Sequence, residues 1–191
     1  MLALLSERSL PREELELRIR SAVSRWRRIV ELNLGREIAD RKRRPFFELI
    51  VARDGVESLD IMKTLISSLR EGVEEIGADF EALIPYLAGV KYGDKMVRAK
   101  LVKSLDDLPY AFAVTGVGLI DVVVEKLDRM VVRIFECVSC YGHEAVGKTM
   151  CYFEMGILRS VLKHLYGENR VIERKCWGLG NQFCEFVVLY Q

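Results

Sequence analysis

The fold is decided by residues 170–190, which read RVIERKCWGLGNQFCEFVVLY. Two runs rich in β-branched and aromatic side chains flank a loop at residues 177–181 that contains two glycines. This pattern is typical of a β-hairpin and predicts strands at residues 170–176 and 183–190. Cys176 and Cys184 lie on either side of the loop.

The chain before this hairpin alternates between helical and strand-like patterns. Residues 117–126 and 130–138 predict a second hairpin, and residues 145–166 predict a helix that ends at Gly167. Further helices are expected at 58–76, at 79–101 with an interruption near Gly89 and Gly93, and from Ser104 to Gly116; residues 46–52 suggest a short strand. Hairpins separated by helices indicate an α+β fold, with a largely antiparallel sheet packed against several helices.

The N-terminal segment is expected to be one long amphipathic helix over residues 11–44. Its apolar positions recur at spacings of three and four: Leu15, Ile19, Ala22, Trp26 and Ile29. We therefore divide the chain into an N-terminal helical extension, residues 1–44, and a body, residues 45–191. The apolar stripe would pack on the body or on a second copy of the chain, in a homodimer.

Composition excludes several classes of protein. Half of the 191 residues are apolar and 30% are charged, which disfavours disorder. The net charge of +1 makes a nucleic-acid partner unlikely, and the basic run at 41–44 is interpreted as a solvated face. No run is long and apolar enough for a membrane span or a signal peptide, so a cytoplasmic location is expected. The five cysteines are then more consistent with thiols or metal ligands than with disulfides.

Three of these cysteines are candidates for a common site. Cys151 shares the apolar stripe of the helix at 145–166, and Cys176 and Cys184 lie at the base of the final hairpin, with Glu173 three residues before Cys176. Tetrahedral zinc accepts such ligands, but ordinary buried cysteines are an equal alternative. On a regular strand Glu173 and Cys176 point to opposite faces, so a shared ion requires a bulge.

The remaining pair, Cys137 and Cys140, closes a predicted strand rather than starting a helix, which disfavours a thioredoxin-like redox role. Either cysteine could replace one of the four zinc ligands.

Residues 142–149, GHEAVGKT, match the G-x-x-x-x-G-K-[ST] pattern of a phosphate-binding loop. Such a loop would place Lys148 on the phosphates of a nucleotide and Thr149 on magnesium. It requires a parallel sheet that supplies a further carboxylate, and the 42 residues after Thr149 predict only a helix and a hairpin. The alternative is that Gly142 and Gly147 shape a turn and that Lys148 is solvated.

The ending as a whole resembles the 4-vinyl reductase domain family. The resemblance lies in Cys151-x4-Gly156 followed by Glu173-x2-Cys176-x3-Gly180-x3-Cys184-x-Phe186. It implies an antiparallel sheet with helices, often dimeric, and a zinc ion held by Cys151, Glu173, Cys176 and Cys184. It also implies a small hydrophobic or aromatic ligand, because members serve as sensory modules for phenols and related hydrocarbons.

Those sensors anchor a phenolic hydroxyl with a histidine and a tryptophan upstream of the zinc helix. Here no histidine precedes His143, and the only earlier tryptophan is Trp26. A more apolar ligand is therefore expected. Our leading hypothesis is a non-enzymatic, small-molecule-binding domain with structural zinc. The alternative is a reductase, or an accessory protein, that acts on a tetrapyrrole vinyl group, although no dinucleotide-binding fingerprint is present.

Overall fold

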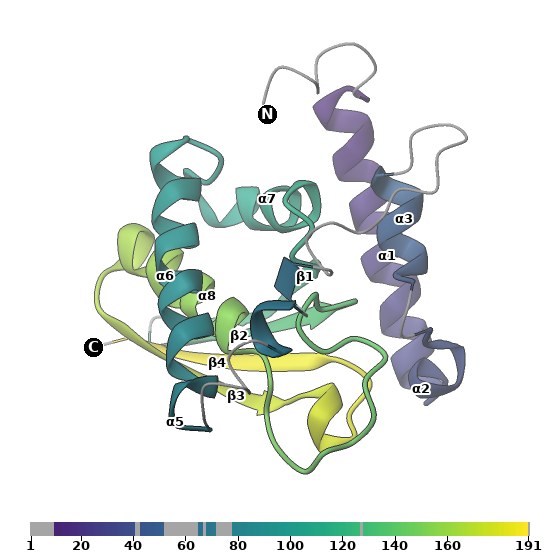
Figure 1. Cartoon of the computed structure of the whole chain (residues 1–191). Helices are drawn as coiled ribbons and strands as arrows, with labels where there is room; N and C mark the ends of the chain where they lie inside the picture. Colours follow the sequence, from purple (N-terminus) through teal and green to yellow (C-terminus); the bar gives the residue numbers. More distant parts are fainter. Residues whose placement is uncertain are drawn as a thin grey trace.

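The computed structural model describes residues 10–40, 43–51, 65–66, 68–71, 78–126 and 128–190. Figure 1 shows an α+β fold, in which α6 and α8 lie together over the sheet and α1 lies beyond its β1 edge. The predicted fold class is confirmed. In the described part of the chain, no helix has the length and apolar character needed to cross a bilayer.

The sheet has four strands, all antiparallel, in the order β1-β2-β4-β3. Their bounds are β1 (Leu119–Glu125), β2 (Arg129–Phe135), β3 (Asn169–Lys175) and β4 (Cys184–Tyr190). Both predicted hairpins are therefore confirmed. The two hairpins join through β2 and β4, where Ile134 pairs with Cys184. This pairing brings the turn after β2 next to the base of the final hairpin.

Two helices pack closely because three glycines remove side chains from their contact. They are α6 (Leu83–Arg98), which follows the short α5 (Ala78–Glu81), and α8 (Tyr152–Tyr166). A Cβ on Gly89 would lie 2.0 Å from the backbone oxygen of Phe153, and one on Gly156 would lie 2.2 Å from that of Tyr86. The expected interruption near Gly89 and Gly93 is wrong: α6 is continuous. The predicted helix at 145–166 is present, but it begins at Tyr152.

The N-terminal segment forms two helices, α1 (Arg12–Glu31) and α2 (Gly35–Ile38), so the prediction of one helix over residues 11–44 is wrong. Asn33 has a φ of 58°, and its N–H donates to the carbonyl of Val30, while the Leu34 N–H donates to that of Ile29. These two bonds form a Schellman motif, which satisfies the last carbonyls of α1 and stops the helix.

Residues 45–51 form a helix, α3 (Pro45–Val51), where a strand was expected. The carboxylate of Glu136 accepts hydrogen bonds from the backbone N–H groups of Phe46 at 2.9 Å and Phe47 at 2.7 Å. Proline is favoured at the first helical position, and an acceptor there satisfies N–H groups that have no partner inside the helix. The contact is distant in sequence, which is why the local pattern did not reveal it.

The helix expected from Ser104 is present as a 3-10 turn, η2 (Leu105–Asp107), followed by α7 (Leu108–Val114). Ser104 and Asp107 form a capping box at its start. The helix expected at 58–76 lies largely outside the described residues.

The hydrophobic core includes the N-terminal helix. Trp26 of α1 has no exposed surface, and its ring stacks on Phe135 with centroids 5.8 Å apart. Its Nε1 donates to Glu136 at 3.1 Å, and the buried Arg44 donates to the backbone oxygen of Glu136 at 3.0 Å. The predicted segments 1–44 and 45–191 therefore share one core, and the apolar stripe of α1 packs on its own chain.

Candidate metal centre and ligand groove

Five cysteines from separate elements meet in the core, and all are buried and unpaired by disulfides. Cys137 and Cys140 lie in the turn after β2, where the N–H groups of Cys140 and Tyr141 donate to the carbonyl of Cys137. The others lie at element ends: Cys151 immediately before α8, Cys176 after β3 and Cys184 at the start of β4. The β2–β4 pairing and the seating of α8 bring these ends together.

The structure brings together the four predicted zinc ligands. One ligand atom from each of Cys151, Glu173, Cys176 and Cys184 lies within 4.8 Å of the other three. The Sγ of Cys151 is 3.7 Å from that of Cys176 and 3.4 Å from that of Cys184. The register of β3 shifts between Glu173 and Lys175, which is the irregularity that the sequence required.

Glu173 is oriented toward this cluster. Its Oε2 accepts a hydrogen bond from the backbone N–H of Cys151 at 3.2 Å. Its Oε1 is buried and has no hydrogen-bond partner among the residues that the structure describes. A buried oxygen without a partner is costly, and a metal ion would satisfy it. The donor set, three thiols and one carboxylate, fits zinc.

Burial shifts the acid–base properties of the cluster. It raises the pKa of the Cys151 and Cys184 thiols above the ordinary value. Burial, together with the charge of Cys176, raises the pKa of Glu173 to about 9. Without an ion, Glu173 is therefore protonated at neutral pH. A divalent cation has to displace protons in order to bind, so its affinity falls as the pH is lowered.

Sequence reasoning missed Glu154, which is fully buried in α8 beside the cluster. Its carboxylate accepts hydrogen bonds from the backbone N–H and hydroxyl of Ser139, at 3.0 and 2.8 Å, and lies 3.0 Å from the Sγ of Cys137. Burial and the adjacent Cys137 raise the pKa of Glu154. The signal was available, because Glu154 interrupts the apolar face of α8 between Phe153 and Ile157.

The loop at 142–149 lacks the arrangement of a phosphate-binding loop. The N–H groups of Val146 and Gly147 donate to the carbonyl of Gly178, at 2.8 and 2.9 Å, instead of pointing into an open cradle. Gly178 lies in η3 (Trp177–Leu179), the loop of the final hairpin. Lys148, expected to be solvated, is exposed and bonds Glu81 at 2.6 Å. The sheet is antiparallel throughout, so the βαβ context of such a loop is also missing from the described strands.

The two histidines form polar contacts away from the thiols. The Nε2 of His143 lies 3.2 Å from a guanidinium nitrogen of Arg70, and that of His164 lies 3.3 Å from Asp94. His143 faces a cation, which disfavours the gain of a proton by its ring.

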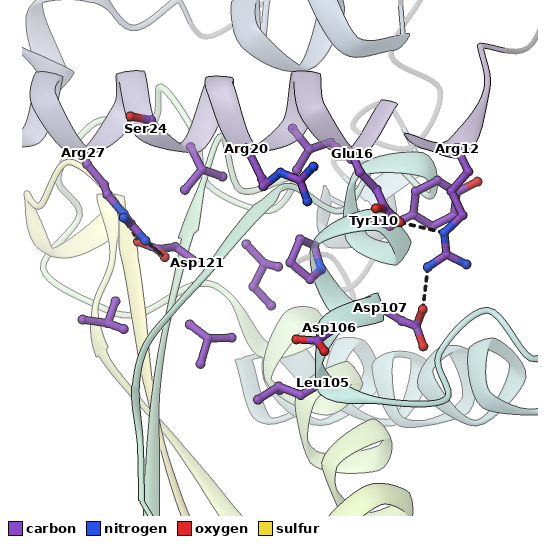
Figure 2. Close-up of a pocket in the computed structure, with 16 residues that line it drawn as sticks. Arg12, Glu16, Arg20, Ser24, Arg27, Leu105, Asp106, Asp107, Tyr110 and Asp121 are labelled. Carbon is purple, nitrogen blue, oxygen red and sulfur yellow. Dashed lines mark hydrogen bonds and ion pairs between the residues drawn. The ribbon is translucent and has the colours of Figure 1, made fainter. Parts of the chain in front are cut away.

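A groove of about 890 Å³ lies between α1, α7 and β1. Figure 2 shows Arg20 pointing into it from α1, with ion pairs at its margins between Arg12 and Asp107 and between Arg27 and Asp121. Apolar side chains from all three elements also line it: Ile19, Val23, Pro109, Ile120, Val122 and Val123. Its volume is in the range of small-molecule sites.

Comparison with known proteins places these features in a family. The family model of the 4-vinyl reductase domain matches residues 130–189, which contain all five cysteines. The uncharacterized protein MJ1642 of Methanocaldococcus jannaschii is 34% identical over 114 residues, 59% of this chain and 66% of that protein. The uncharacterized protein MJ0150 of the same organism is 30% identical over 130 residues, 65% of this chain and 73% of that protein. The chain thus spans about two thirds of the length of MJ1642.

Two solved structures share the fold. The phenol-responsive sensory domain of the transcription activator PoxR, solved with phenol, has a TM-score of 0.53 and 15% identity, and the match covers 67% of this chain and 73% of that chain. A vinyl-4-reductase family protein from Methanocaldococcus jannaschii has a TM-score of 0.51 and 18% identity, with 74% and 86% covered. The motif match, the two relatives and the shared fold agree, and this chain belongs to the 4-vinyl reductase domain family.

Proposed function

We propose that this protein is a non-enzymatic, small-molecule-binding sensory domain whose C-terminal part is stabilised by a structural zinc ion. The observation that carries the proposal is the convergence of Cys151, Glu173, Cys176 and Cys184, with the partnerless Oε1 of Glu173. These residues lie within the part of the chain that the family model matches. Zinc bound there would cross-link the start of α8 to the β3–β4 hairpin.

The ligand set supports a structural role over a catalytic one. Four protein ligands complete a tetrahedral site, whereas catalytic zinc keeps one position open for water or substrate. All three cysteines are fully buried. A substrate therefore has neither a free coordination position nor a path from solvent along these side chains.

The groove is the site that we assign to the small molecule. The fold is shared with a sensory domain solved with phenol, and the groove joins an apolar floor to a charged margin. Trp26 does not line it, because its ring is buried against Phe135 and Tyr141. We therefore assign a ligand held mainly by apolar contact.

A homodimer in the cytoplasm completes the proposal. The apolar stripe of α1 is occupied within its own chain, since Ile19, Ala22 and Trp26 are buried. The dimer contact would thus use another face. Size-exclusion chromatography with light scattering tests it, and a monomeric mass at micromolar concentration would remove this part of the proposal.

The zinc site is tested with matched variants of the final hairpin. Glu173→Gln removes the carboxylate ligand with almost no change of shape, and Glu185→Gln makes the same change on the paired strand, where Glu185 bonds Arg133. Zinc per chain, measured after purification without added metal, should fall in Glu173→Gln and stay unchanged in Glu185→Gln. Equal zinc in both variants would contradict the site.

The groove is tested with the uncharged fluorescent probe Nile red. Val123 lines the groove at the bulge of β1 and is 40% exposed, whereas Val146 is 53% exposed and lies outside it. A charge placed in an apolar contact weakens binding, so Val123→Asp should reduce probe affinity at least tenfold, while Val146→Asp should not. The same affinity in both variants would place the ligand elsewhere.

A further inference from the structure

The cysteine cluster contains more ligands than one zinc ion uses. Two sets of four ligand atoms each lie within 4.8 Å of one another: Cys137, Cys140, Cys151 and Cys184 form one set, and Cys151, Glu173, Cys176 and Cys184 form the other. Cys151 and Cys184 belong to both. The zinc ion of the proposed function accounts for the second set only, which leaves Cys137 and Cys140 unused.

Sulfur spacing in the first set fits a second ion. The Sγ of Cys140 lies 3.1 Å from those of Cys151 and Cys184, and the Sγ of Cys137 lies 3.4 Å from that of Cys151. With zinc–sulfur bonds of about 2.3 Å, the corners of a tetrahedron lie about 3.8 Å apart. An outward movement of a few tenths of an ångström therefore creates the site.

Local structure presents the unused pair as a chelate. Cys137 and Cys140 have the Cys-x2-Cys spacing that zinc sites commonly use, and the turn between them is closed by two hydrogen bonds to the carbonyl of Cys137. Glu154 bonds Ser139 inside that turn and so fixes it from α8. Outer contacts of this kind hold metal ligands in position.

The geometry points to a two-metal centre, in which the thiolates of Cys151 and Cys184 bridge two divalent ions such as zinc. Cys137 and Cys140 complete the first ion, and Glu173 and Cys176 complete the second. A thiolate sulfur has enough lone pairs to bind two ions, and the two bridging sulfurs are 3.4 Å apart. This inference rests on the proposed function, because the second set must hold its ion.

The charge balance permits the additional ion. The first-set ion brings two positive charges, and the thiols of Cys137 and Cys140 lose two protons to solvent as they bind it. The centre thus carries the same net charge with two ions as with one. Burial of the second ion therefore adds no unpaired charge to the core, which is the usual obstacle to such a site.

Metal stoichiometry of the full chain tests the centre. Native mass spectrometry and elemental analysis should find two zinc ions per wild-type chain. The double variant Cys137→Ser/Cys140→Ser should keep one ion, and Glu173→Gln/Cys176→Ser should also keep one. A single ion in the wild type that persists in the first variant would overturn the second ion and leave the proposed function standing.

The other outcomes separate the two proposals. No zinc in the wild type would defeat both, and a single ion lost only in Cys137→Ser/Cys140→Ser would assign it to the first set and also defeat both. Should the variants fail to fold, cobalt(II) titration of the metal-free wild type decides the question. The visible absorption of thiolate-bound cobalt should rise up to two equivalents, and a plateau at one equivalent would overturn the two-metal centre.

Discussion

Replacement of Trp26 by alanine tests whether α1 is part of the domain. The side chain has no exposed surface, and its ring contacts those of Phe46, Phe135 and Tyr141 at centroid distances of 5.8 Å. Truncation of a buried tryptophan costs about 3–5 kcal/mol of unfolding free energy. Loss of the bond from Nε1 to Glu136 adds about 1 kcal/mol, because that carboxylate keeps its two backbone donors.

The expected loss is therefore about 4–6 kcal/mol, compared with 5–15 kcal/mol for the whole stability of a typical domain. Urea unfolding followed by far-ultraviolet circular dichroism measures it. Leu17→Ala is the matched control, since Leu17 lies on the same helix and is 62% exposed; its change should stay within about 0.5 kcal/mol. A loss below about 1 kcal/mol for Trp26→Ala would show that α1 is a separable extension and would refute the shared core.

Three further changes follow from the packing. Gly89→Ala places a Cβ 2.0 Å from a backbone oxygen of α8, so it should cost about 1–3 kcal/mol or more in thermal unfolding, and an unchanged melting temperature would contradict the close α6–α8 contact. Asp107→Ala removes the capping box and should cost about 1 kcal/mol. Hydrogen bonding to Arg12 lowers the pKa of Asp107 to about 2, so its contribution should be complete above about pH 4 and lost as the pH falls toward 2; unfolding at several pH values should show the wild type and variant converging in acid. Lys148→Ala should cost less than about 1 kcal/mol, and calorimetry should detect no ATP binding to either protein; binding abolished by the variant would restore the nucleotide hypothesis.

Local sequence patterns were sufficient for the sheet and for the main ligand set. β-branched runs bounded by turn residues predicted both hairpins, because strand preference and turn chemistry act within a few residues. The base of a hairpin also brings its flanking residues together, which made Cys176 and Cys184 neighbours before any tertiary contact was known. The bulge beside Glu173 was inferred as a condition of the site, and the structure contains it.

Contacts between distant segments decided the parts that were not predicted. Residues 46–52 are a short apolar run that suits either a strand or a buried helix, and the carboxylate of Glu136 selects the helix by capping it. Gly89 and Gly93 looked like helix interruptions, whereas they allow α8 to approach α6. The convergence of Cys137 and Cys140 with Cys151 depends on the turn after β2, where Glu136 has a φ of 48° that its residue type does not announce.

Anomalous X-ray diffraction at the zinc absorption edge tests the metal centre most directly. Crystals of protein purified without added metal should show a strong anomalous peak about 2.3 Å from the sulfur atoms of Cys151, Cys176 and Cys184 and bonded to the Glu173 carboxylate. Ordered thiols at these positions with no anomalous density between them, in protein that elemental analysis finds free of metal, would contradict the account.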